Sequence, residues 1–300
     1  MKTLEFLSGQ MGEMLWPAVA AGVGVALLGA ALSVPVVLKR LAFIGQGVSH
    51  AAFGGAGIAL VLGLVGTGAA MSLAYLGVVG AFCVMTAIAV AWVSSRGTGT
   101  GGNGAGGGES ATAEDTIIGV FLVAAMALGA LLTHWQRNRA PGSRVPSAEQ
   151  ILFGSILDVG WADAAIAWVV LVATLITLIS QRRALVFWLF DEPAAEAFGV
   201  RVAPMRYLLL ALLGVATVTA MKLAGAVLAT AVLVIPGAAA LRLSERLGTV
   251  VLLAGTVGLV GMVGGMVVSF EMDWPPGACV VLVLAAQYLG ASVWNRLFRS

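Results

Sequence analysis

Long apolar segments separated by short polar stretches follow one another along almost the whole chain. A helix needs about 20 apolar residues, each rising about 1.5 Å, to cross a hydrocarbon core about 30 Å thick. Nine segments meet or approach this length, and we therefore predict an all-α polytopic bundle of eight or nine transmembrane helices. The nine segments are residues 16–38, 41–66, 71–94, 116–134, 161–181, 206–221, 223–242, 247–270 and 275–295.

The segment 206–242 leaves the number of helices open between eight and nine. Its 37 residues have to cross twice, and only Lys222 and Gly225 mark a turn. That leaves about 18 residues for each crossing, which is close to the lower limit for a spanning helix. A short or re-entrant helix is the alternative, because a membrane tolerates one where protein or water satisfies its backbone.

The composition of the chain excludes a soluble domain. Apolar residues make up 60% of the sequence and charged residues 10%, and the mean hydropathy is +1.02. A soluble domain has roughly 45–50% apolar and about 25% charged residues. The net charge of +2 indicates neither nucleic-acid binding nor an acidic tail. Cys83 and Cys279 lie far apart in apolar segments, so their spacing indicates no disulfide framework and no zinc ribbon.

The basic residues predict how the chain is oriented, because Lys and Arg are enriched in the cytoplasmic loops of membrane proteins. With nine crossings and an external N-terminus, eleven of the 16 basic residues face the cytoplasm and five face outside. The opposite orientation reverses that ratio. We therefore predict an external N-terminus and a cytoplasmic C-terminus. The five external basic residues are then Lys2, Arg137, Arg139, Arg144 and Lys222.

Two hydrophilic stretches interrupt the apolar pattern on the predicted cytoplasmic side. Residues 97–108 form an uncharged glycine-rich sequence that is typical of a flexible linker. Residues 182–205 mix charged and apolar side chains and are expected to be a structured loop. The sequence has no GxxxxGK[ST] motif, so a separate chain must bind ATP if ATP drives this protein. We treat residues 1–300 as one transmembrane domain that carries both stretches.

His50 is one of only two histidines, and it lies within the predicted helix 41–66. Nine residues into that helix, it is about 14 Å deep and close to the bilayer midplane. Gln46 lies one turn earlier on the same face, and Ser49 is adjacent. A polar side chain at this depth is costly unless it lines a cavity or meets a partner, and neutral imidazole suits Zn, Mn or Fe. A metal pathway and a hydrogen bond between helices explain these residues equally well.

A short helix with its own start and stop signals is predicted within residues 182–205. Asp191 suits the N-cap, Pro193 falls in the first turn, and Gly199 ends the helix. Such a helix between two membrane spans could dock on a soluble partner, and a capped surface turn explains the pattern equally well. Its apolar face consists of Ala194, Ala195 and Phe198.

The predicted external loop 135–150 runs against the trend in charge, because it carries Arg137, Arg139 and Arg144. These arginines could pair with acidic side chains of an external binding protein. A solvated loop without a partner is the simpler explanation.

Five sequence blocks occur in the order and spacing of one known family. With them, the chain from about residue 14 to 295 resembles the zinc, manganese and iron permeases of bacterial ABC importers, the ABC-3 group. The blocks are IGQGVSHAAFGG (44–55), EDTIIGVFLVAAMALG (114–129), LFGSILDV (152–159), DEPAAEAFGVRV (191–202) and LAGAVLATAVLVIPGAAA (223–240).

The resemblance implies a multi-pass permease in the bacterial inner membrane that imports a divalent zinc, manganese or iron ion. Such a subunit is no enzyme and holds no permanent cofactor, because ATP is hydrolysed on cytoplasmic ATPase subunits. The resemblance also implies an external metal-binding protein and a second permease, either a copy of this chain or a relative. It assigns contact with the ATPase to Asp191, Glu192, Ala195, Phe198 and Gly199.

One departure from the family pattern concerns the metal pathway. The IGDxxSH block of the family places an acid and a histidine there; His50 matches the histidine, whereas Gln46 stands where the acid usually is. An amide oxygen contributes only a dipole where a carboxylate contributes a charge, so the identity of the metal stays open. The alternative function is a secondary transporter or channel without ATP, against which the scarcity of intramembrane acids argues.

Overall fold

The structure, a computed structural model, describes residues 12–64, 69–97, 109–139, 154 and 159–298. Every regular element in these ranges is a helix, which confirms the all-α prediction. The helices before the long gap are α2 (Gly12–Leu38), α3 (Ala42–Val61), α4 (Ala69–Gly97) and α5 (Glu109–Arg139). The later ones are α7 (Trp161–Ser180), α8 (Arg182–Phe190), α9 (Glu192–Ala197), α10 (Val202–Leu243), α11 (Leu247–Met272) and α12 (Pro276–Phe298).

Each predicted membrane segment coincides with a helix or with half of one. Among the described residues, seven helical segments are long and apolar enough to cross a membrane, namely those in α2, α5, α7, both halves of α10, α11 and α12. Helices α3 and α4 occupy the other two predicted segments. The positions of the helices were therefore predicted correctly, while the number that cross and the orientation of the termini remain predictions.

Helix α10 is broken at Gly225, where φ is 81° and ψ is 163°. Glycine adopts such a positive φ without the steric cost that other residues carry. A Cβ on Gly29 of α2 would overlap Val232, and one on Gly237 would overlap Ser33, so the second half of α10 runs alongside α2 in the same direction. The chain thus reverses at Gly225 almost without a loop, which favours two crossings over a re-entrant helix.

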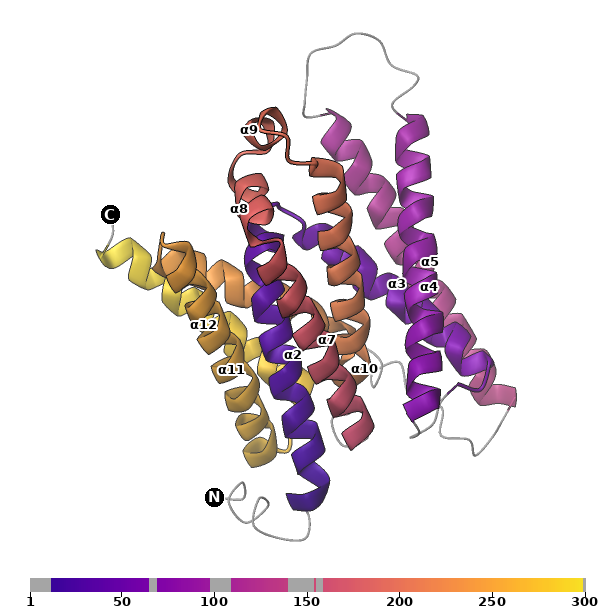
Figure 1. The fold of residues 1–300 in the computed structure, drawn as a ribbon. Helices are drawn as coiled ribbons and strands as arrows, with labels where there is room; N and C mark the ends of the chain where they lie inside the picture. Colours follow the sequence, from indigo (N-terminus) through magenta and orange to yellow (C-terminus); the bar gives the residue numbers. More distant parts are fainter. Residues whose placement is uncertain (1–11, 65–68, 98–108, 140–153, 155–158, 299–300) are drawn as a thin grey trace.

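The two ends of the bundle differ in what they carry. We call residues 182–201, which include α8 and α9, the elbow, and the end of the bundle where they lie the elbow end (Figure 1). The end that carries the reversal at Gly225 is the hairpin end. Helix α2 runs from the hairpin end to the elbow end, whereas α3 and the first half of α10 run the opposite way (Figure 1).

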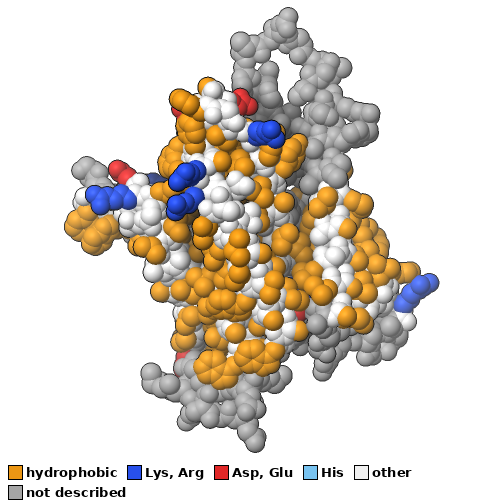
Figure 2. Space-filling model, in the orientation of Figure 1, with side chains coloured by type: hydrophobic (Ala, Val, Ile, Leu, Met, Phe, Trp, Pro, Cys, Tyr) orange, Lys and Arg blue, Asp and Glu red, His pale blue; other side chains and the backbone are white. Residues whose placement is uncertain are grey.

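Helix α3 joins two groups of helices. Figure 1 shows α2 among α7, α10, α11 and α12, with α4 and α5 together at one side. Helix α3 packs against α4 and α5 and also against α10. The outer surface is largely hydrophobic, and the charged side chains visible in Figure 2 lie mainly toward the elbow end. This distribution suits a bundle surrounded by lipid.

Candidate functional site

His50 lies in the middle of α3 and is partly exposed. Its Nδ1 atom is buried and has no hydrogen-bond partner. Ser49 is fully buried, at 0% exposure, whereas Gln46, one turn closer to the elbow end, is exposed. The three residues predicted to line a metal pathway therefore differ in burial. Ser49 is buried in the bundle, His50 is partly exposed, and Gln46 is exposed.

Close glycine contacts explain which way His50 faces. A Cβ on Gly54 would lie 2.9 Å from the carbonyl oxygen of Ala125, and one on Gly57 would lie 3.1 Å from Cα of Gly129. Both contacts hold α3 against α5. His50 precedes Gly54 by one helical turn and so lies on the same face of α3. The imidazole is thus on the side of α3 that faces α5, one turn nearer the elbow end.

Another face of α3 packs on α10 and brings a further polar residue to the site. A Cβ on Gly45 would lie 3.6 Å from a methyl carbon of Leu213, so the first turn of α3 contacts α10. On α10, Thr217 follows Leu213 by one helical turn, as Ser49 follows Gly45 on α3. Thr217 is 0% exposed, and its hydroxyl has no partner. The sequence analysis missed Thr217, because a lone threonine in an apolar helix gives no signal of its own.

Buried polar atoms without a partner are rare in proteins. Three of those found in the described residues belong to Ser49, His50 and Thr217, on the neighbouring helices α3 and α10. The complete set is Ser49 Oγ, His50 Nδ1, Trp188 Nε1, Thr217 Oγ1 and Ser292 Oγ. Three of the five buried side-chain atoms without a partner in the described residues thus lie in the middle of α3 and on α10.

The site offers few strong metal ligands. No group of three or more His, Cys, Asp or Glu side chains forms within the part of the chain that the structure describes. A closed structural metal site uses about four such ligands and would trap an ion, whereas conduction requires weak binding. One imidazole with nearby hydroxyl and amide oxygens fits transient contact with a cation better than permanent storage.

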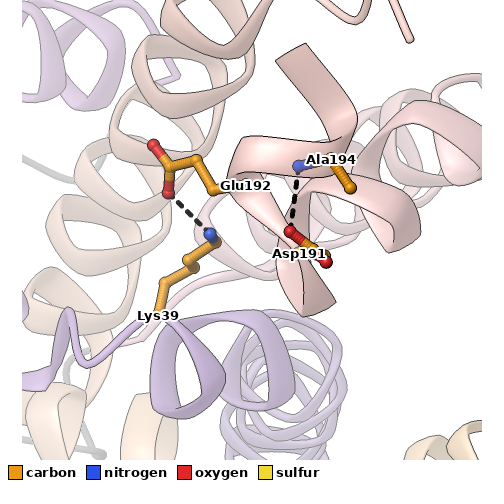
Figure 3. Close-up of polar contacts among 4 residues, drawn as sticks. All are labelled: Lys39, Asp191, Glu192 and Ala194. Carbon is orange, nitrogen blue, oxygen red and sulfur yellow. Dashed lines mark hydrogen bonds and ion pairs between the residues drawn. The ribbon is translucent and has the colours of Figure 1, made fainter. Parts of the chain in front are cut away.

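The elbow has the capped helix that the sequence predicts. The Asp191 carboxylate accepts a hydrogen bond of 2.9 Å from the backbone N–H of Ala194 (Figure 3), and Pro193 falls in the first turn. Gly199 follows the helix with φ at 82°, a conformation that favours glycine. The start and stop signals of α9 are therefore confirmed.

An ion pair ties the elbow to α2. Lys39 Nζ donates to Glu192 Oε2 at 2.8 Å (Figure 3), and the same ammonium group lies 4.4 Å from the ring centroid of Trp188. The hydrogen bond from Lys39 lowers the pKa of Glu192 below its usual value, so this carboxylate stays ionised. The end of α2 and the short helix α9 are thus connected directly.

The residues predicted to touch an ATPase divide into two groups. Ala195 is 0% exposed and packs in a core cluster with Leu185 and Val202, so it supports α9 from inside. Phe198 is 80% exposed, and its ring centroid lies 5.7 Å from that of Phe187. Phe198 therefore presents an apolar side chain outward, while the capping and turn residues hold α9 in place.

The predicted external arginines are only partly described. Arg137 and Arg139 are exposed in the last turn of α5, where the helix dipole favours cations. The Arg139 guanidinium lies 4.3 Å from the ring centroid of Trp135. Arg144 lies outside the described residues, as does most of the glycine-rich linker 97–108.

A second ion pair lies at the hairpin end. Lys222 Nζ donates to Asp163 Oδ1 at 2.5 Å and lies 5.7 Å from the ring centroid of Tyr75. The pair connects α10, close to its break, with the first turn of α7. The sequence marked Lys222 as a turn residue on the predicted external side but did not reveal its partner, because nothing local points to a residue 59 positions away.

Comparison with known proteins decides the family. The model of the ABC 3 transport family matches residues 11–295. The chain belongs to the ABC 3 transport family. Membership confirms the predicted resemblance, and together with the apolar helices it identifies a multi-pass membrane protein.

Relatives within the ABC 3 transport family align along almost the whole chain. The manganese transport system membrane protein MntC of Halalkalibacterium halodurans is 30% identical over 290 residues, which cover 96% of this chain and 90% of MntC. The high-affinity zinc uptake system membrane protein ZnuB of Haemophilus influenzae is 26% identical over 275 residues, covering 92% of this chain and 95% of ZnuB. The structure of PsaBC from Streptococcus pneumoniae in complex with Fab is similar with a TM-score of 0.78 and 26% identity, covering 96% of this chain and 93% of the matched one.

Proposed function

We propose that this chain is the membrane-spanning permease of an ABC importer for a divalent transition metal, namely zinc, manganese or iron. The observation that carries the proposal is the His50 Nδ1 atom, buried without a hydrogen-bond partner in the middle of α3, within a family whose members include manganese and zinc transport proteins. A partly exposed imidazole with a free ring nitrogen suits passing contact with such an ion. Gln46 and Ser49 add an amide and a hydroxyl oxygen beside it.

The elbow end faces the cytoplasm in this proposal, and the N-terminus lies outside. The excess of basic residues in the predicted cytoplasmic loops supports this orientation. The elbow then lies where cytoplasmic ATPase subunits can reach it. Phe198 contacts the ATPase, while Asp191, Gly199 and Ala195 hold α9 in shape. Glu192 passes movement of α9 to α2 through its ion pair with Lys39.

A second permease, a copy of this chain or a relative, completes the pathway. The partial exposure of His50 and the exposure of Gln46 support this assembly, because both side chains have surface left for a neighbouring molecule. The described residues of one chain bring too few strong ligands together to bind an ion alone. A site shared between two permeases supplies more ligands without enclosing the ion within either chain.

An extracytoplasmic metal-binding protein delivers the ion in this scheme. Arg137, Arg139 and Arg144 then lie on the outer side, where they can pair with acidic side chains of that protein. Exchanging the three arginines for glutamates is expected to weaken docking. Binding of the isolated metal-binding protein to permease in nanodiscs measures this effect, and unchanged affinity would remove the assignment.

Uptake by the reconstituted transporter tests the proposed function. Permease, the cognate ATPase and the binding protein are placed in liposomes, and uptake of isotopic zinc, manganese and iron is followed with and without ATP inside. The proposal predicts uptake of at least one of these metals only when ATP is hydrolysed. Uptake that follows an ion gradient and ignores ATP would instead establish a secondary transporter.

A further inference from the structure

We propose that Lys222, Asp163 and Tyr75 form a latch at the hairpin end of the permease. The Lys222 ammonium group, paired with Asp163 of α7, closes against the ring of Tyr75 on α4, and its contact with Tyr75 opens when a cation enters from the hairpin end. The inference rests on the proposed function, in which the hairpin end lies outside. It adds a contact that changes during each transport cycle, which neither the His50 site nor the elbow supplies.

The side chains of the latch come from three helices. Lys222 Nζ lies 2.5 Å from Asp163 Oδ1 of α7 and 5.7 Å from the ring centroid of Tyr75 of α4. A cation within about 6 Å of the centroid of an aromatic ring is attracted to the face of that ring. The Lys222 and Asp163 side chains are 20% and 12% exposed, so water and salt screen the ion pair only in part. One ammonium group on α10 therefore contacts both α7 and α4.

Next to the latch, a groove of about 340 Å³ separates α4 from α10. Leu76 and Val218 line the end of the groove that adjoins the latch, and each lies within one helical turn of the latch residue on its own helix. On the two walls of the groove, a Cβ on Gly80 or on Gly214 would meet no neighbouring atom within 4 Å. Helices with open space between them can move relative to each other without losing close-packed contacts.

The space at the latch itself is far smaller. The cavity there has a volume of about 10 Å³, which is about the least that holds one water molecule. Its lining includes Lys222 and Asp163 together with Leu76, which also lines the groove. The helices are therefore in contact at the latch and separated along the groove beside it.

Of the two contacts that Lys222 makes in the latch, the one with Tyr75 opens at the lower cost. Separating Lys222 from Asp163 would leave two largely buried charges apart from each other, which is strongly unfavourable. Moving the ring of Tyr75 away removes only the weaker attraction between cation and ring, and the ammonium group keeps its carboxylate. We therefore expect α4 to move away from the latch while α7 and α10 stay joined.

Cross-linking of the latch tests the inference in the complete reconstituted transporter. Tyr75→Cys and Lys222→Cys are combined in a chain whose native Cys83 and Cys279 are replaced by alanine, and a short bifunctional methanethiosulfonate joins the two new thiols. Because α4 can then no longer move away, we expect ATP-driven metal uptake to fall about tenfold and to recover when a reductant cleaves the link. Equal uptake by the linked and the reduced forms would overturn the inference.

A cross-link between helices that stay together is the matched control. A Cβ on Gly24 of α2 would lie 3.4 Å from the Cβ of Ala167 on α7, close to the separation of about 3.5–4.5 Å found in disulfides. Gly24→Cys with Ala167→Cys, oxidised to a disulfide in the same background, should change uptake by less than about twofold. A loss as large as that of the linked latch would show that any cross-link stops transport, and would count against the latch.

Passive release of metal gives a second measurement, which decides the outcome if the cysteine variants do not fold. Tyr75→Leu removes the aromatic ring, whereas Tyr75→Phe keeps it. Liposomes loaded with isotopic manganese or zinc should release the metal without ATP about fivefold faster with Tyr75→Leu than with wild type, and less than about twofold faster with Tyr75→Phe. Equal release from all three proteins would overturn the inference, even if thermal stability fell. Wild-type protein without ATP-driven metal uptake would instead refute the proposed function itself.

Discussion

The elbow and the middle of α3 differ in how their polar side chains are paired, although the elbow also holds one buried atom without a partner, Trp188 Nε1. At the elbow, Asp191 caps α9 and Glu192 pairs with Lys39, so both carboxylates have partners inside the chain. In α3, Ser49 and His50 hold buried atoms without partners. Paired groups are explained by the fold that they stabilise, whereas unpaired buried groups cost stability and require another explanation. The contrast fits a structural joint at the elbow and the ligand-contacting site that we propose in α3.

Energies support this distinction. A partly exposed ion pair such as Lys39–Glu192 stabilises a protein by at most about 1 kcal/mol, so its main effect is to hold α9 in a fixed position. A buried hydroxyl or ring nitrogen without a partner costs about 1–3 kcal/mol. Three such atoms on two neighbouring helices are a substantial cost for a protein whose net stability is of the order of 10 kcal/mol.

Removing the aromatic side chain of Phe198 should have the largest effect apart from changes to His50. Phe198→Ala is expected to reduce ATP-driven uptake about tenfold, because it removes the apolar side chain that we propose contacts the ATPase. Thermal stability should hardly change, since Phe198 is 80% exposed. Uptake and ATP hydrolysis by the same liposomes measure this. Phe190→Ala, at an exposed position of α8, is the control, and equal losses in both variants would argue against a specific contact.

Restoring an acid near His50 should have the next largest effect. Gln46→Asp places a carboxylate where the family usually has one, and we expect the manganese-to-zinc uptake ratio to rise about fivefold, because a charged oxygen ligand favours the harder ion. Gln46→Asn keeps the amide and serves as the control. If both variants transport the two metals in the wild-type ratio, residue 46 lies off the pathway.

Breaking the ion pair of the elbow should have a smaller effect. Lys39→Met is expected to lower uptake about twofold to threefold and stability by less than about 1 kcal/mol, because the pair is partly exposed. A double-mutant cycle with Glu192→Gln, read from thermal unfolding and uptake, isolates the pair from the separate effects of each change. Fully additive losses would show that the two side chains do not act together.

The smallest expected effect is on the pH dependence of stability. Because Lys39 lowers the folded-state pKa of Glu192, the pair stabilises the fold above the unfolded-state value of about 4.3, and this contribution is lost as the pH falls through the lower folded-state pKa. Glu192→Gln should therefore make stability less dependent on pH in the acidic range only. Parallel melting curves of wild type and variant between neutral and acidic pH measure the difference, and identical slopes would contradict it.

The sequence predicted those features of the fold that depend on residues close together in the chain. Apolar runs located the helices, Lys222 and Gly225 marked the reversal in α10, and Asp191 with Gly199 marked the ends of α9. Each of these signals depends on residues close together in the chain, so it can be found without knowing how the helices pack.

Features that depend on packing were not predicted. The ion pair between Lys39 and Glu192 joins residues 153 positions apart, and only the packed structure shows that the Thr217 hydroxyl is buried without a partner. The apolar face of α9 also proved to be divided, with Ala195 inside and Phe198 outside. A pattern of apolar residues on so short a helix does not tell which of them face the core.

The central claim is that the imidazole of His50 contacts the transported metal, and His50→Ala tests it most directly. His134→Ala is the matched control, because this exposed histidine lies at the end of α5, with Asn138 Nδ2 3.1 Å from its Nε2. The account predicts that His50→Ala lowers ATP-driven metal uptake by at least about tenfold, equivalent to about 1.4 kcal/mol, while His134→Ala stays near wild type. Metal uptake at the wild-type rate by a correctly folded His50→Ala transporter would contradict the claim.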